Sequence, residues 1–87
     1  MSYYVYVLKS LKDDIRYIGY TKRSINEKLS EHNIKISCWT SNHKPWKLVY
    51  YEEFKCIKCA INREKFFKTG YGRKLLDVIL DANIFNL

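Results

Sequence analysis

The sequence predicts an α+β domain, in which two strands, a helix, a third strand and two further helices follow one another. Three observations lead to this class: aromatic and β-branched runs without helical periodicity, a capping box before an apolar stripe, and later segments with apolar residues at helical spacing. A chain of 87 residues is long enough for one hydrophobic core. We therefore expect one domain over residues 1–80 and a short apolar tail over residues 81–87.

The chain opens with a predicted β-hairpin. Residues 3–8 are aromatic and β-branched without alternation, which indicates a strand buried on both faces. Residues 9–14 are polar and predict a turn, and residues 15–21 read as the return strand.

The hairpin is unusually rich in tyrosine and carries one glycine inside its second strand. Under the strand period of two, Tyr4 and Tyr6 share a face, and so do Tyr17 and Gly19. A glycine within a strand often marks a bulge or a place where another group approaches closely. Phenolic hydroxyls are therefore expected near an opening in the sheet.

The first helix is predicted from its capping box, Ser24-Ile25-Asn26-Glu27, and should run to about Asn33. Leu29 and His32 then share its apolar face, and Lys28 lies beside them. A lysine and a histidine are therefore expected at the border of the buried apolar stripe.

Residues 34–45 lack a consistent period and are expected to form a loop. Residues 46–54 alternate and predict the third strand. Strict alternation would place these side chains on one of its faces: Trp46, Leu48, Tyr50, Glu52 and Phe54.

The second helix is expected over residues 56–68, with Gly70 as its C-terminal cap, and the third over residues 73–80. On the second helix Glu64 falls where the apolar stripe calls for another apolar residue. A buried carboxylate is costly unless it is paired or binds a metal. A salt bridge, a position at the edge of the stripe and a metal ligand all remain open.

The charge balance favours an anionic partner. Sixteen Lys and Arg against nine Asp and Glu leave a formal charge of +7, which points to nucleic acid before membrane lipid, although excess lysine can also serve solubility alone. No leading signal sequence and no long apolar run are found, so an intracellular, cytoplasmic protein without membrane association is expected, or a nuclear or virion-associated one if the source is eukaryotic or viral.

The ordered motifs resemble those of the GIY-YIG nuclease superfamily, and most closely its small stand-alone, UPF0213-like subfamily, over residues 3–80. The resemblance rests on these stretches: Tyr4-Val5-Tyr6, Tyr17-Ile18-Gly19, Glu31-His32-Asn33, PWKLVYYEEF and NREKFFKTGYGR.

That resemblance implies a β-β-α-β-α-α fold with a three-stranded antiparallel sheet flanked by helices. It implies a DNA endonuclease that uses one divalent ion, Mg²⁺ or Mn²⁺, and acts in repair, recombination or mobile-element biology. Tyr6 would act as general base or orient the attacking water, Tyr17 would position nucleophile and phosphate, and Glu64 would hold the metal. His32 would assist in positioning the phosphate or the nucleophile.

Two positions depart from the family pattern. Tyr4 replaces a glycine of the first motif, which should matter little. Lys28 stands where the family usually has arginine, and lysine lacks the planar fork that grips two phosphate oxygens. We expect a weakened active site, in which Lys28 contributes charge and Arg23 is a candidate replacement for the guanidinium.

Double-stranded or branched DNA is the expected partner, with little sequence specificity and with a homodimer or a targeting protein as a further possibility. The expected phosphate contacts are Lys22, Arg23, Arg63, Lys68 and Arg73. The alternatives are a nucleic-acid-binding module that has lost turnover, and a pure protein-interaction domain.

The remaining conspicuous residues receive structural interpretations. Cys56 and Cys59 form a CxxC motif, and Cys38 is a third cysteine. The CxxC spacing is compatible with a zinc or redox site, but reduced, structural thiols are favoured. Trp39 and Trp46 are expected to anchor the core or a loop, with base stacking the less favoured use.

Overall fold

The computed structural model describes residues 2–13, 15–22, 24, 25, 27, 29 and 43–81. Its named elements, in chain order, are β1 (Tyr3–Ser10), β2 (Arg16–Thr21), β3 (Trp46–Phe54), α3 (Ile57–Phe67) and α4 (Gly70–Asp81).

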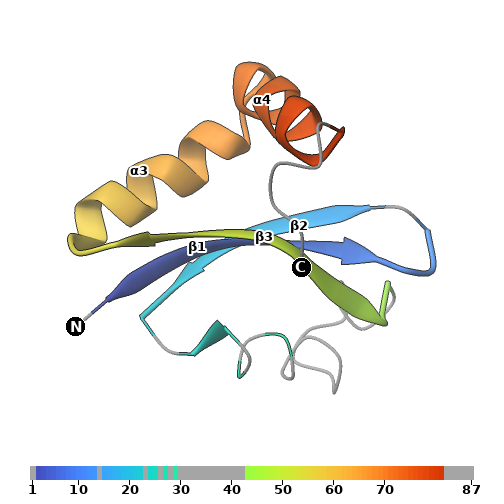
Figure 1. The fold of residues 1–87 in the computed structure, drawn as a ribbon, viewed down its shortest axis with the longest axis horizontal. Helices are drawn as coiled ribbons and strands as arrows, with labels where there is room; N and C mark the ends of the chain where they lie inside the picture. Colours follow the sequence, from blue (N-terminus) through green and yellow to red (C-terminus); the bar gives the residue numbers. More distant parts are fainter. Residues whose placement is uncertain are drawn as a thin grey trace.

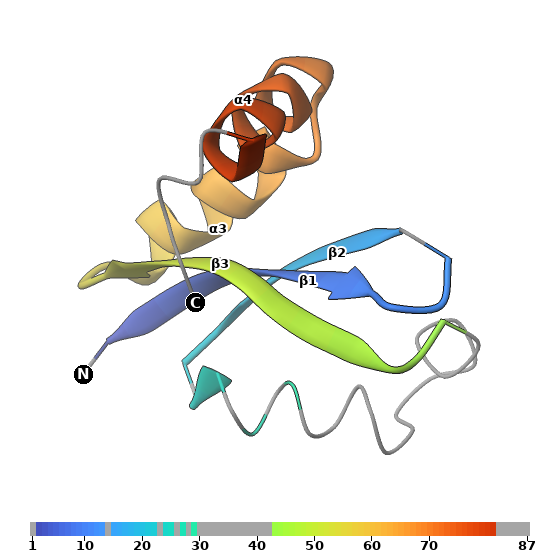
Figure 2. The same cartoon turned by 45° about the vertical axis from the view of Figure 1, so that its right-hand side comes forward.

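The three strands form one antiparallel sheet in the order β2-β1-β3. Because β1 is central and both of its faces are covered, its residues Val5, Tyr6, Val7 and Leu8 are all buried. Helices α3 and α4 lie on one face of the sheet, and the described residues 24, 25, 27 and 29 lie on the other (Figures 1 and 2). The predicted α+β class and the both-face burial of the first strand are confirmed.

The described positions of the expected first helix agree with it, since Ile25, Glu27 and Leu29 are helical. Most of that helix, with Lys28 and His32, lies outside the described residues. The expected loop likewise falls largely outside them.

Each face of the sheet has its own apolar cluster. Under α3 and α4, Val5 and Val7 pack with Ala60, Phe67 and Leu76. On the opposite face, the buried members are Tyr6, Leu8 and Trp46, against which Tyr17, Ile25, Leu29 and Leu48 pack. Tyr6 and Tyr17 of the hairpin therefore pack into the cluster on the face opposite α3, whereas Tyr3 packs against the cluster under α3 and α4.

The strict alternation expected along β3 is wrong at one point. Leu8 pairs with Leu48 while Val7 pairs with Tyr50, so Val49 is an extra residue, a β-bulge, in β3. The bulge turns Trp46 and Leu48 to the face of Tyr6, whereas Tyr50 joins the opposite cluster. Trp46 thereby reaches the tyrosines of the hairpin.

The expected cap at Gly70 is also wrong, because Gly70 is the first residue of α4 and no described glycine has a positive φ. Thr69 caps α4 instead, since its Oγ1 accepts a hydrogen bond from the Gly72 amide at 3.1 Å. A Cβ on Gly72 would lie 1.9 Å from the Phe66 carbonyl oxygen. Thr69 and Gly72 thus let α4 start directly behind α3.

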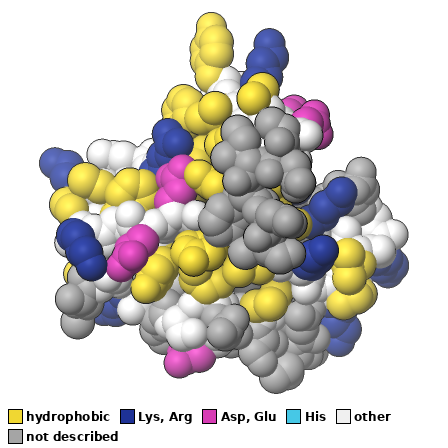
Figure 3. All heavy atoms as spheres, in the orientation of Figure 1, with side chains coloured by type: hydrophobic (Ala, Val, Ile, Leu, Met, Phe, Trp, Pro, Cys, Tyr) yellow, Lys and Arg dark blue, Asp and Glu magenta, His cyan; other side chains and the backbone are white. Residues whose placement is uncertain are grey.

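Lys and Arg side chains are scattered over the face drawn in Figure 3 and do not form one block there. Within the described parts of the chain, no helix has both the length and the apolar character needed to cross a membrane.

Candidate active site

Tyr6 and Gly19 are direct cross-strand neighbours on β1 and β2. A Cβ added to Gly19 would lie 2.7 Å from the hydroxyl oxygen of Tyr6 and 2.8 Å from its Cζ. The hydroxyl end of the Tyr6 ring therefore occupies the space that a side chain at Gly19 would need. A glycine at this position was expected to mark either a bulge or the close approach of another group. The structure shows a close approach, and the approaching group is the Tyr6 side chain.

Tyr17 stands in the middle of a row of aromatic rings. Its ring centroid lies 6.2 Å from that of Tyr6 and 6.2 Å from that of Trp46, with the Trp46 ring edge-on. Tyr6 is only 2% exposed, whereas Tyr17 is half-buried on the edge strand β2. Of the two tyrosines, Tyr17 is the one that solvent and ligands can reach.

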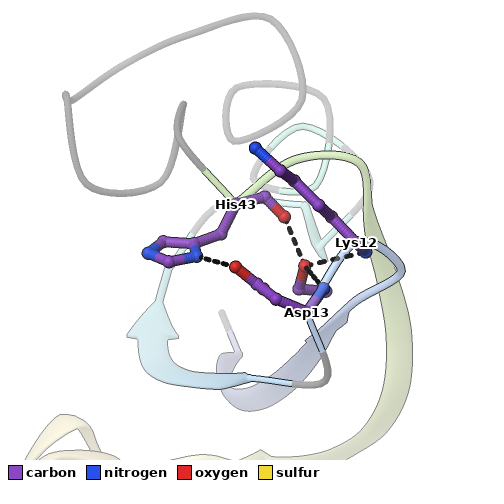
Figure 4. Close-up of polar contacts among 4 residues, drawn as sticks. Lys12, Asp13 and His43 are labelled. Atoms are coloured by element: carbon purple, nitrogen blue, oxygen red, sulfur yellow. Dashed lines mark hydrogen bonds and ion pairs between the residues drawn. The ribbon is translucent and has the colours of Figure 1, made fainter.

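A polar cluster supports the far end of this row (Figure 4). The Ser10 hydroxyl donates to the His43 carbonyl at 2.5 Å and accepts from the amides of Lys12 and Asp13. The His43 ring pairs through Nδ1 with the Asp13 carboxylate at 2.5 Å and lies 6.4 Å from the Trp46 ring. This hydrogen bond from His43 lowers the pKa of Asp13. The cluster ties the hairpin turn to the start of β3.

A groove of about 590 Å³ lies where β2 faces the end of α3 and the start of α4. Its polar lining consists of Arg16, Tyr17, Lys68 and Arg73, and its apolar floor of Ile15, Ile18 and Leu76. Three cationic side chains around one phenol make a site suited to a phosphate-bearing ligand.

Glu64 lies on α3 beside this groove and is 15% exposed on its side chain. Its carboxylate is 3.5 Å from Nζ of Lys68, one turn later on the same helix. Burial raises the pKa of Tyr17, and the negative charge of Glu64 raises it further. Two predicted site residues from distant parts of the chain are therefore electrostatic neighbours.

The number of metal-binding side chains near Glu64 determines which kind of metal site is compatible with the structure. The described residues contain no group of three or more His, Cys, Asp or Glu side chains able to hold an ion. Mg²⁺, however, commonly takes one or two carboxylates and completes its shell with water and substrate phosphate. Glu64 beside a cationic groove fits an ion that is shared with a phosphate and completes its shell with water.

The predicted site residues are not all in this region. Tyr6, Tyr17, Glu64, Lys68 and Arg73 come together, whereas Lys22 is exposed beyond the other end of β2. Lys28 and His32, with Arg23, lie outside the described residues.

Arg63 has a different place from the one expected. Its guanidinium makes two hydrogen bonds to Glu52, at 2.8 and 3.1 Å, and lies 4.5 Å above the Phe67 ring. Glu52 also accepts from the Tyr50 hydroxyl at 2.6 Å. One edge of the guanidinium is bonded to β3 and its face covers a core ring, so Arg63 joins α3 to the sheet, and we do not include it among the phosphate contacts.

Two residues of this region were not identified from the sequence. Arg16 lines the groove and pairs with Asp77 of α4 at 2.6 Å. Its position next to Tyr17 could have marked Arg16 as a site residue. Its ion pair with Asp77 could not be predicted, because the two residues are far apart in the sequence. Trp46 was expected in the core, but its contact with Tyr17 depends on the bulge at Val49.

Comparison with known proteins gives two matches. The family model described as the GIY-YIG catalytic domain matches residues 2–76. A UPF0213 protein of Clostridium perfringens is 33% identical over 82 residues, which cover 93% of this chain and 86% of that protein. No solved structure matches at a comparable level of significance.

Proposed function

Because the chain belongs to the GIY-YIG family, a nuclease superfamily, we propose that it is a metal-dependent DNA endonuclease with little sequence specificity of its own. The observation that carries this proposal is the position of Tyr17, which contacts the Tyr6 ring, lines the cationic groove and feels the charge of Glu64. Phosphodiester hydrolysis needs a group that orients water, a cation for the developing charge and a carboxylate for a metal.

The groove would take the DNA backbone. Lys68 and Arg73 approach from the helices and Arg16 from β2, so phosphate oxygens next to Tyr17 meet positive charge from two sides. Contacts of this kind fix position on DNA without reading bases. Lys28 and His32 of the first helix are proposed to complete the phosphate site.

Tyr17 would act as a hydrogen-bond donor in the resting site. Burial and the charge of Glu64 raise its pKa, so the phenol keeps its proton at neutral pH and can orient a water or a phosphate oxygen. Tyr6 contacts the Tyr17 ring from its buried side and limits its movement. Glu64 would hold one Mg²⁺, which supplies charge stabilisation to the phosphate when it is bound.

Plasmid cleavage tests this proposal. Supercoiled DNA is incubated with the wild type, Glu64→Gln and Tyr17→Phe, each with Mg²⁺ and with EDTA. We expect nicking by the wild type in Mg²⁺ alone, and a loss of about 100-fold or more in both variants. Glu53→Gln is the matched control, because Glu53 is an exposed carboxylate of β3 that contacts Ser2 and Lys55. Nicking by Glu64→Gln at the wild-type rate would refute the proposed metal ligand.

A second function is favoured by one specific residue. Lys28 replaces the family arginine and cannot form its bidentate phosphate contact. A nucleic-acid-binding module without turnover would follow if this loss is decisive. In that case DNA stays intact under all conditions, while a salt-sensitive gel shift persists in both the wild type and Glu64→Gln.

A further inference from the structure

Two thiols lie together where β3 passes into α3, outside the candidate active site. Cys56 is the N-cap of α3, with extended backbone angles of φ −121° and ψ 126°, and Cys59 lies in the first helical turn. Both are free and exposed. Their exposure removes the packing explanation, because neither thiol contributes to either apolar cluster.

The start of α3 places the two cysteines on neighbouring positions. With Ile57 as the first helical residue, Cys56 is the N-cap and Cys59 the third helical residue, and side chains three positions apart on a helical turn lie next to each other. The Ala60 amide bonds the Cys56 carbonyl at 3.2 Å, so the first turn is formed and holds this arrangement.

The two thiols are chemically unequal. Polar contacts with the amide and thiol of Cys59 and with the Lys58 amide lower the pKa of Cys56, and the Lys58 charge adds to this. The same contact with Cys56 raises the pKa of Cys59. One member is therefore disposed to be a thiolate and the other to remain a thiol, which is the division between an attacking and a resolving cysteine.

We propose that Cys56 and Cys59 are a reversible dithiol–disulfide site, oxidised by a low-molecular-weight disulfide of the glutathione class. The Cys56 thiolate attacks one sulfur of the oxidant, forms a mixed disulfide and releases one thiolate. The Cys59 thiol then attacks Sγ of Cys56, loses its proton to solvent and releases the second thiolate. Two protein thiols are oxidised to one disulfide, and one disulfide is reduced to two small thiols.

Zinc binding is the less suitable use of this pair. Structural zinc takes four ligands, and two thiolates supply only half of them. The described part of the chain offers no third His, Cys, Asp or Glu near enough to form a metal-binding group with them. The dithiol needs no further ligand.

Thiol trapping tests the proposal on the full-length protein. The folded wild type and Cys38→Ser are incubated with oxidised glutathione, quenched with a maleimide and mapped by mass spectrometry. We expect a Cys56–Cys59 disulfide in both, reversed by dithiothreitol, with circular dichroism unchanged. Cys59→Ser should stop at a mixed disulfide on Cys56, and Cys56→Ser should react severalfold more slowly.

Iodoacetamide alkylation near neutral pH gives an independent measure. In the Cys38→Ser background, Cys56 left alone by Cys59→Ser should react severalfold faster than Cys59 left alone by Cys56→Ser, because a larger fraction of Cys56 is thiolate, although a thiolate of lower pKa is a weaker nucleophile. Equal alkylation rates, a disulfide that uses Cys38 or joins two chains, or stoichiometric zinc that protects both thiols would each overturn the proposal. None of these results depends on nuclease activity.

Discussion

At the residue scale, the absence of a side chain at Gly19 is what allows Tyr6 to lie across β2. An alanine there would place its Cβ 2.7 Å from the Tyr6 hydroxyl oxygen, and Tyr6 is too buried to move aside freely. The ring that would be displaced also contacts Tyr17. Stability and the geometry of the candidate site are therefore coupled at this position.

Gly19→Ala should lower the free energy of unfolding by about 1–3 kcal/mol, because overpacking a filled site forces neighbours off their preferred positions. Urea denaturation measures the change. Gly70→Ala is the matched control, since a Cβ there meets nothing within 4 Å, and it should be neutral or slightly stabilising. Equal midpoints for the two variants would contradict the close approach of Tyr6.

The pKa of Tyr17 gives a second prediction at this scale. Burial raises it first and the charge of Glu64 second, so Glu64→Gln should lower it while leaving it above the ordinary value. Because the pKa is raised in the folded state, its stabilising contribution is fully present below the unfolded pKa and is lost as pH rises through the folded pKa. Titration of ¹³C-labelled tyrosine, assigned with Tyr17→Phe, measures the shift. Glu53→Gln should leave the Tyr17 titration unchanged.

The residue patterns predicted which strand residues share a face. The period of two correctly paired Tyr4 with Tyr6, and Tyr17 with Gly19, whereas the cross-strand pairing of Tyr6 with Gly19 came from the structure. Glu64 was selected as a carboxylate on an apolar stripe, and its role as a metal ligand stays a prediction. The pairing of Arg63 with Glu52 was not predicted, because Glu52 lies on another element and local spacing does not encode whether an arginine pairs with a carboxylate or a phosphate.

At the scale of elements, two ion pairs fix the helices relative to the sheet. Arg63 of α3 forms an ion pair with Glu52 of β3, and Arg16 of β2 forms one with Asp77 of α4. The first pair is half-buried and shares Glu52 with the Tyr50 hydroxyl, whereas the second is exposed at its acid. Breaking the first pair should therefore lower the stability of the fold, whereas breaking the second should mainly change DNA affinity.

Arg63→Ala should cost about 1–3 kcal/mol, because Glu52 would keep its charge in a half-buried place without its bidentate partner. Urea denaturation measures the loss. DNA affinity should fall no further than in Lys65→Ala, which removes an equal charge from an exposed position on α3. A fall in affinity specific to Arg63→Ala at unchanged stability would restore it as a phosphate contact.

Asp77→Asn should tighten DNA binding by about 1.4- to 5-fold, because it releases the Arg16 guanidinium from an exposed pair that is worth about 0.2–1 kcal/mol. Fluorescence anisotropy at low salt measures the affinity. Glu53→Gln is the control for charge alone, since Glu53 is an exposed carboxylate of β3 whose ion pair is with Lys55. The gain should vanish in the double variant Arg16→Ala/Asp77→Asn, and its persistence there would rule out release of Arg16 as the cause.

Element order and approximate bounds followed from periodicity, but the joins between elements did not. A bulge such as that at Val49 adds one residue without any glycine to mark it, so alternation was carried past the point where it fails. Thr69 and Gly72 together determine where α4 begins. Gly70 was predicted to be the C-terminal cap of α3 because the N-cap role of the neighbouring Thr69 was not recognised in the sequence.

At the scale of the whole molecule, the excess positive charge is dispersed, and the fold decides which part of it faces one ligand. Basic side chains are scattered over the view in Figure 3, yet Arg16, Lys68 and Arg73 line a single groove. Net charge predicted an anionic partner from composition alone, but the groove exists only because β2 is an edge strand and α4 starts directly after α3.

The salt dependence of DNA binding separates groove contacts from general attraction. Each phosphate contact contributes about 0.9 to the slope of log K against log salt concentration, so Arg73→Ala should reduce that slope by about one. Lys74→Ala is the matched control, because Lys74 is exposed on the next position of α4 and does not line the groove. It should weaken binding slightly through the overall charge and leave the slope nearly unchanged. Equal slopes for the two variants would mean that DNA is held by the dispersed charge of the surface, and that Tyr17 and Glu64 do not face a bound phosphate.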